Sequence, residues 1–131
     1  MVEMRNLDPE TPMFAQFAQE TGPVVLTNTF VVPPERGEVF LTLFRRQAEY
    51  MKARPGFVSL QMHKGTAGSR LFMNVAVWES SAALAAALRS PEFQRLAADF
   101  PSDVVSYPHV FERIDIERVD NERADIERID T

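Results

Sequence analysis

The sequence predicts an α+β fold in which two helices cover one face of a four-stranded antiparallel sheet. Three observations support this prediction. Four segments are rich in β-branched and aromatic residues, as β-strands are. Two further segments carry apolar residues at helical spacing. Proline and glycine separate these segments, whose order is strand, helix, strand, strand, helix, strand.

The first strand and the first helix are predicted over residues 24–32 and 34–53. The strand segment reads VVLTNTFVV, and Pro33 ends it because proline cannot continue a sheet. Pro34 suits the first turn of a helix, and the Arg-Pro-Gly sequence from residue 54 breaks the helix. One apolar stripe runs along this helix through Phe40, Leu43, Phe44, Ala48 and Met51.

A hairpin is predicted next, with strands over residues 57–64 and 70–79. The loop between them, GTAGS, contains two glycines, which is typical of a hairpin connection. Ser80 or Ser81 then caps a second helix. Ser90 and the proline after it restart that helix, because serine is a good cap and proline fits the first turn.

A fourth strand is predicted over residues 107–116, and Pro108 near its start indicates an edge strand. The complete order of elements is the split βαβ arrangement of the ferredoxin-like fold, βαββαβ. We therefore expect a ferredoxin-like α+β domain over residues 24–116.

Two segments flank this domain. Residues 1–23 are predicted to form an N-terminal arm with a short helix that begins near Thr11-Pro12. Residues 117–131 form a charged, repeat-like extension of period five, in which aspartate stands three residues before arginine and would pair with it on a helix. Either a solvated, partly helical extension or a segment that swaps onto a partner subunit would explain this pattern.

The strand over residues 70–79 is apolar on both faces. Because side chains alternate along a strand, Asn74 and Trp78 share one face. The opposite face carries only apolar side chains, whereas a solvent-exposed sheet face normally carries polar ones. Helices cover one face, and we expect a second copy of the sheet to cover the other, which predicts a homodimer. The predicted dimer face consists of Leu71, Met73, Val75 and Val77.

Composition excludes several classes of function. The chain has 131 residues and a net charge of -5, which argues against a nucleic-acid partner because such binding needs a basic surface. No stretch of 18 apolar residues could cross a membrane. The sequence has no cysteine, which excludes thiolate chemistry and fits a cytoplasmic location. With two histidines far apart, we expect no metal site.

Asn74 and Trp78 are the first candidates for a functional site. A carboxamide and an indole N–H on a helix-covered face need hydrogen-bond partners. They could hold a carbonyl, a phenolate or a developing oxyanion, or they could be a packed tryptophan and an asparagine satisfied by the backbone. Asn28, in the middle of the first strand, could join the same pocket or bond to a helix end.

Four short motifs together resemble the antibiotic biosynthesis monooxygenase family. The resemblance covers most of the chain, from about residue 24 to residue 114. It rests on the segments RPGFV (residues 54–58), FMNVAVWES (72–80), SPEF (90–93) and YPHVF (107–111). This resemblance implies a dimeric α+β barrel.

The resemblance also implies an activity. Members of this family oxidise aromatic polyketide-type phenols or anthrones to quinones with O2, without a flavin, haem or metal. Asn74 and Trp78 match the positions that these members use to hold the substrate carbonyl and the reacting oxygen, so we expect them to be catalytic. We expect no cofactor, and a small aromatic substrate with O2 as partners. Asn28, Phe44, Phe72 and Phe93 are the expected substrate-binding residues.

Two departures from the pattern of the quinone-forming members concern a tyrosine and an arginine. Leu84 stands near the place of a tyrosine found in quinone-forming members, and Arg95 is the candidate for their distal arginine. A second branch of the family degrades haem and needs a histidine ligand for iron shortly after the SPxF motif. This chain reads QRLAA there, without a histidine, which argues against haem degradation. A non-catalytic dimeric protein that binds a small aromatic ligand is the main alternative, and a haem-degrading monooxygenase is another.

Overall fold

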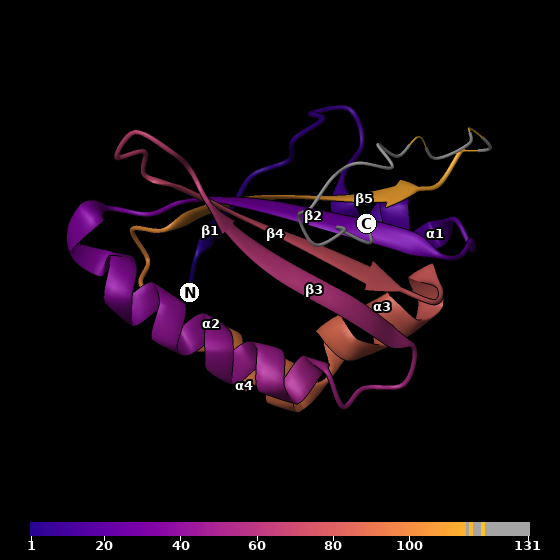
Figure 1. Cartoon of the computed structure of the whole chain (residues 1–131). Coiled ribbons are helices and arrows are strands. Elements are labelled where there is room, and N and C mark those ends of the chain that lie inside the picture. The colour runs from indigo at the N-terminus through magenta and orange to yellow at the C-terminus, as the bar shows by residue number, and fades with distance from the viewer. Residues whose placement is uncertain (115, 117–118, 120–131) are drawn as a thin grey trace.

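The computed structural model describes residues 1–114, 116 and 119 of the chain. The repeat-like extension predicted for residues 117–131 lies outside the described residues, apart from position 119. Within the described part, five strands form one sheet in the order β1-β5-β2-β4-β3. The fold is the predicted ferredoxin-like α+β fold (Figure 1).

Four long strands make up most of the sheet, and neighbouring ones among them run antiparallel. The central pair is formed by β2 and β4, so residues in the middle of these two strands lie at the centre of the sheet. The strands span Val24–Val31 (β2), Phe57–Lys64 (β3), Leu71–Trp78 (β4) and Val105–Glu112 (β5).

Three helices, α2, α3 and α4, lie on one side of this sheet (Figure 1). A 3₁₀ turn at Pro34–Arg36 leads into α2, Gly37–Met51. The second predicted helix is two helices, α3 (Ser81–Arg89) and α4 (Pro91–Ala98). Ser90 separates them because a residue before proline avoids the helical region, and its hydroxyl accepts a hydrogen bond from the Phe93 N–H at 3.3 Å.

The N-terminal arm adds structure that the sequence did not predict. Besides the short helix α1, Met13–Ala18, it contains a two-residue strand, β1, Glu3–Met4, which pairs in parallel with Val105 and Ser106 of β5. The sheet is therefore mixed and five-stranded rather than four-stranded and antiparallel. At Gly22 a Cβ would lie 2.1 Å from the Glu79 carbonyl oxygen, so only glycine allows the arm to approach the end of β4 this closely.

The prediction that Pro108 marks an edge strand is wrong. β5 lies between β1 and β2, and Pro108 stands opposite Asn28 of β2. The sheet tolerates the proline because β1 pairs only with residues 105 and 106. Two residues further on, the Val110 N–H points to the arm and donates to Gln16 Oε1 at 2.8 Å. The N–H that Pro108 lacks would point to the same unpaired side.

The buried core lies between the sheet and the helices, in two clusters. One cluster gathers around Trp78 and Leu84. The other is aromatic and centres on the fully buried Phe40, whose ring centroid lies 4.9 Å from that of Phe30 and 5.3 Å from that of Phe72. These clusters fix the helices against β2 and β4 and so determine the depth of the space beneath the two strands.

The two faces of β4 differ as predicted. Asn74 and Trp78 are buried on the helix side, whereas Leu71 and Met73 point the other way and are 42% and 37% exposed. Val77 differs from them: it was predicted for the dimer face, but it is only 4% exposed within a single chain. The exposed apolar part of that face is therefore smaller than predicted.

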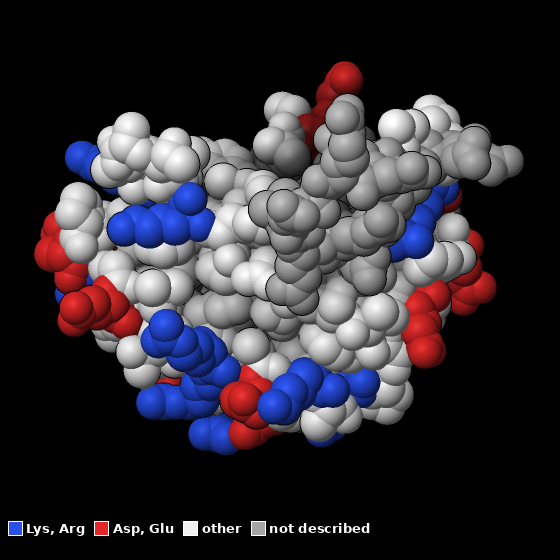
Figure 2. All heavy atoms as spheres, in the orientation of Figure 1, with Lys and Arg blue, Asp and Glu red and all other residues white. Residues whose placement is uncertain are grey.

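The charged residues of the surface are mixed in sign. In the view of Figure 2, lysine and arginine side chains alternate with aspartate and glutamate along the lower edge, where α2 lies. Among the described residues, no helix is long and apolar enough to span a membrane.

Candidate functional site

Asn28 and Asn74 lie directly opposite each other on the two central strands. The register continues this row across the sheet, with Met62 of β3 beside Asn74 and Pro108 of β5 beside Asn28. The row therefore places two carboxamides between apolar neighbours at the centre of the helix-covered face. This position explains how two asparagines 46 places apart in sequence come to share one site.

The Oδ1 atoms of Asn28 and Asn74 are buried, and neither has a hydrogen-bond partner among the described residues. A buried polar atom without a partner costs roughly 1–3 kcal/mol, so sequences rarely retain one without a reason. The alternative that these asparagines are satisfied by the backbone or by a helix end does not hold for these two oxygens. A ligand that carries a hydroxyl or N–H group would supply the missing donor.

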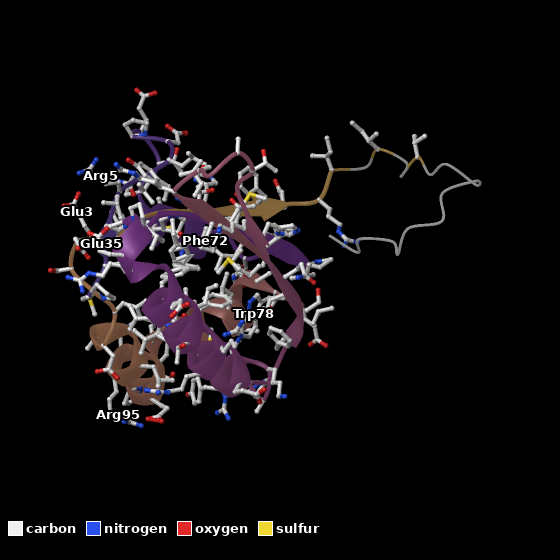
Figure 3. All side chains as sticks on the ribbon, turned by 60° about the vertical axis from the view of Figure 1, so that its left-hand side comes forward. Glu3, Arg5, Glu35, Phe72, Trp78 and Arg95 are labelled. Atoms are coloured by element: carbon white, nitrogen blue, oxygen red, sulfur yellow. The ribbon has the colours of Figure 1, made fainter. Side chains whose placement is uncertain are left out.

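Trp78 lies on the same face of β4, at its C-terminal end, and Phe72 lies near the other end (Figure 3). The indole is 1% exposed and packs edge-on against Phe57, with a centroid separation of 5.3 Å. Such T-shaped packing holds the ring in one orientation. Trp78 is thus part of the core and also lines the cavity described next.

Two adjoining hollows lie beneath the sheet. The smaller, of about 70 Å³, is lined by Asn74, Trp78 and residues of α2, α3, α4 and β3. The larger, of about 310 Å³, extends from Asn28 towards β5, α4 and the N-terminal arm. The two hollows share the lining residues Leu26, Asn28, Phe30, Gln47, Leu88 and Phe93.

Five of the six predicted site residues meet at the smaller hollow: Asn28, Phe44, Asn74, Trp78 and Phe93. Phe72 does not line it. Its ring packs on Phe40, and the Lys64 ammonium lies 5.9 Å from its centroid. Phe72 points to the same side as Asn74 but lies two residues nearer the start of β4. There it packs into the aromatic cluster and contributes to the core.

The sequence reading missed Gln47 of α2, which lines both hollows. A signal for it was present. Gln47 lies three residues after Phe44 and four before Met51, both of which are buried, so helical spacing places it on the buried face. A polar residue within an apolar stripe is a candidate for contact with a ligand.

The other candidates occupy varied positions. Arg95 pairs with Glu92 on the exposed surface of α4, and this hydrogen-bonded pair raises the pKa of Arg95 (Figure 3). Arg89, at the end of α3, lines the larger hollow instead. Leu84 is fully buried in the core.

Both histidines lie away from the cavity. His63 stands opposite Met73, whose side chain is on the outer face, and His109 stands opposite Thr27 on that same face. No histidine, aspartate or glutamate lines either hollow among the described residues. In the same part of the chain, no group of three such side chains is placed to hold a metal ion. The smaller hollow is therefore apolar, with carboxamides and an indole as its polar groups, and Arg89 and Ser106 add polar groups to the larger one.

Comparison with known proteins identifies relatives of this chain. The family model for antibiotic biosynthesis monooxygenase (ABM) matches residues 23–99, which is more than half of the chain. No functionally curated protein matches it significantly. Among solved structures, SnoaB, a cofactor-independent oxygenase from Streptomyces nogalater, is 26% identical with a TM-score of 0.66, covering 73% of this chain and 97% of SnoaB. A putative monooxygenase from Shewanella loihica PV-4 is also 26% identical, with a TM-score of 0.59, covering 72% of this chain and 97% of the other.

Proposed function

Since the chain belongs to the antibiotic biosynthesis monooxygenase family, we propose that it oxidises a phenol or anthrone of polyketide type to a quinone with O2 and without a bound cofactor. The observation that carries this proposal is the pair of buried, unpartnered amide oxygens at an apolar cavity. The similarity to SnoaB, a cofactor-independent oxygenase, supports it.

The carboxamide pair suits a phenol in both of its protonation states. A neutral hydroxyl donates to an asparagine Oδ1, and a phenolate accepts from an Nδ2–H of the same group. Because each carboxamide carries both an acceptor and a donor, Asn28 and Asn74 together can hold the substrate oxygen before and after it loses its proton. Donors fixed in an apolar cavity stabilise negative charge far more than water-exposed donors do.

The reaction balances without a cofactor. The anthrone methylene loses a proton, and the resulting carbanion, whose charge is delocalised onto the ring oxygen, gives one electron to O2. The two radicals combine at the methylene carbon to form a peroxide, which loses water to leave the new carbonyl. One oxygen atom of O2 enters the quinone, and the other leaves as water with the two methylene hydrogens.

The protein contributes orientation and charge stabilisation to this scheme. Asn28 and Asn74 bind the anionic substrate oxygen. Trp78 lines the same hollow, and its indole N–H is the donor available for the reduced oxygen. In the part of the chain that the structure describes, the cavity lining offers no carboxylate or imidazole as a base. The first proton therefore leaves to water, and the two carboxamides favour this step by stabilising the anion.

Oxygen consumption tests the proposal. Metal-free protein mixed with dithranol, a three-ring anthrone, should consume one O2 per anthraquinone formed, faster than dithranol alone. An oxygen electrode measures the O2 consumed, and the quinone absorbance measures the anthraquinone formed. Binding of dithranol without consumption above background would instead favour the alternative of a non-catalytic aromatic-binding protein. A Soret shift on titration with haem would favour the haem-degrading alternative.

We also propose that the protein is a homodimer in which the outer faces of two sheets meet. Leu71 and Met73 are exposed on this face, in the first half of β4, where an isolated chain would leave apolar area in water. Met73→Asp should convert the dimer to a monomer in analytical ultracentrifugation, because it buries an unpaired charge on each side of the interface. Val39→Asp, an equally apolar, exposed position on α2, is the control and should leave the dimer intact. A monomeric wild type would refute the proposal.

A further inference from the structure

The N-terminal arm forms one wall of the larger hollow. Five of its residues line this space, opposite side chains from α3 and α4: Met1, Val2, Met4, Met13 and Phe17. Asn28 is at the sheet side of the same space, with an unpartnered amide oxygen. The arm therefore faces a polar group that the proposed reaction uses.

Main-chain and side-chain hydrogen bonds hold the arm against β5. The Glu3 N–H donates to the Val104 carbonyl at 2.9 Å, and the Arg5 N–H donates to the Ser106 carbonyl at 2.8 Å. Gln16 accepts from the Val110 N–H. Between these anchors the chain turns at Asp8, whose carboxylate accepts from the Glu10 N–H, and this bond lowers the pKa of Asp8. The arm is thus a fixed part of the cavity.

This wall lies before the part of the chain that the family model matches. The family match begins at residue 23, after the arm. Nearly all of SnoaB, 97%, corresponds to only 73% of this chain. The arm therefore adds lining residues to a family site, and residues of this kind determine which ligands fit without taking part in the chemistry.

We infer that the arm completes a binding site for a planar aromatic ligand of at least three fused rings, whose far edge lies against Met13 and Phe17. The inference rests on the proposed function in taking the ligand to be aromatic. The smaller hollow, of about 70 Å³, is too small for such a ligand, whereas the larger one, of about 310 Å³, falls within the range of roughly 300–1,000 Å³ typical of small-molecule sites.

The chemistry of the wall fits this ligand. Methionine thioethers are polarizable and pack well on aromatic rings, and three of the five arm residues are methionines. Arg89 lines the same space and provides a positive charge for a phenolate or an acidic substituent. A ligand oriented in this way has one oxygen where the two hollows adjoin, at Asn28 and beside its strand partner Asn74, and its ring system along the arm.

Met13→Glu tests the inference, with Phe14→Glu as the matched control. The two positions are neighbours in the first turn of α1, where a glutamate is tolerated, but Met13 lines the cavity and Phe14 is 79% exposed. The probes are 1,8-dihydroxyanthraquinone, with three rings, and 1-naphthol, with two. Binding is followed by quenching of Trp78, the single tryptophan of the chain.

For Met13→Glu we expect Kd for the anthraquinone to rise about tenfold or more, because the ligand must lie against a charged group. Kd for naphthol, which needs only the space beside the asparagines, should change less than about threefold, and Phe14→Glu should change neither. Equal affinity of Met13→Glu and wild type for the anthraquinone would overturn the inference and leave the proposed function standing. Arm-dependent binding without O2 consumption from dithranol would overturn the proposed function and support the inference. Failure of wild type to bind either probe would overturn both.

Discussion

Asn74→Ala should lower the rate of O2 consumption with dithranol by about 100-fold, because loss of one preorganised donor to a developing oxyanion costs roughly 10²–10³ in kcat. The substitution removes a buried amide whose oxygen has no partner, so the folded state loses little. We therefore expect a melting temperature close to that of wild type. Steady-state oxygen-electrode kinetics and thermal unfolding followed by circular dichroism measure the two effects.

Gln61→Ala is the matched control for Asn74→Ala. It also removes a carboxamide, but from the neighbouring strand β3, where Gln61 is exposed and stands opposite Val75 on the outer face. Its activity should equal that of wild type. If Asn74→Ala retained activity within about threefold of wild type, the assignment of this carboxamide to oxyanion stabilisation would be wrong. The activity of Asn28→Ala would then show whether Asn28 alone holds the substrate oxygen.

Phe40→Ala should destabilise the fold by about 3–5 kcal/mol, the usual cost of replacing a buried phenylalanine by alanine. Phe40 is fully buried, and its ring lies within 4.9–6.3 Å, centroid to centroid, of the rings of Phe30, Phe72, Phe100 and Phe44. The cavity left behind cannot collapse easily, because the sheet fixes Phe30 and Phe72. Urea denaturation followed by fluorescence measures the loss.

The control for Phe40→Ala is Phe14→Ala, since Phe14 is 79% exposed and should contribute less than about 0.5 kcal/mol. Phe40 does not line the two hollows beneath the sheet. Folded Phe40→Ala at low temperature should therefore still bind the anthraquinone. A loss of stability below about 1 kcal/mol would mean that this cluster does not stabilise the fold as its burial indicates.

The order of elements could be predicted from sequence because each long strand and helix has its own periodicity and its own proline or glycine boundary. The face of β4 that carries Asn74 and Trp78 followed from simple alternation. The features that could not be predicted, β1 and the surroundings of Pro108, depend on residues far away in the sequence. The two-residue strand β1 is too short to show a periodic pattern in the sequence, and it is a strand only because it pairs with β5. The environment of Pro108 depends on how far that pairing extends.

The candidate site was predictable to the extent that its residues belong to regular elements. Phe44 and Phe93 lie on apolar helix faces, so their approach to the sheet was expected. Phe72 was misplaced because alternation gives the face of a strand but not which helix residue covers each position along it. The direct pairing of Asn28 with Asn74 required the register of β2 on β4, which no local pattern specifies.

The attachment of β1 to β5 has a consequence for how such a protein can change. Its bonds to Val104 and Ser106 run from main chain to main chain. They require an N–H at residues 3 and 5, which excludes proline, but no particular side chain. The side chains of Met4 and its neighbours can therefore be exchanged without loosening the arm. Under the proposed function, substrate preference can then diverge through the few arm residues that line the cavity, while the carboxamide pair stays constant. An arm transplanted from another sequence would serve as an exchangeable specificity element.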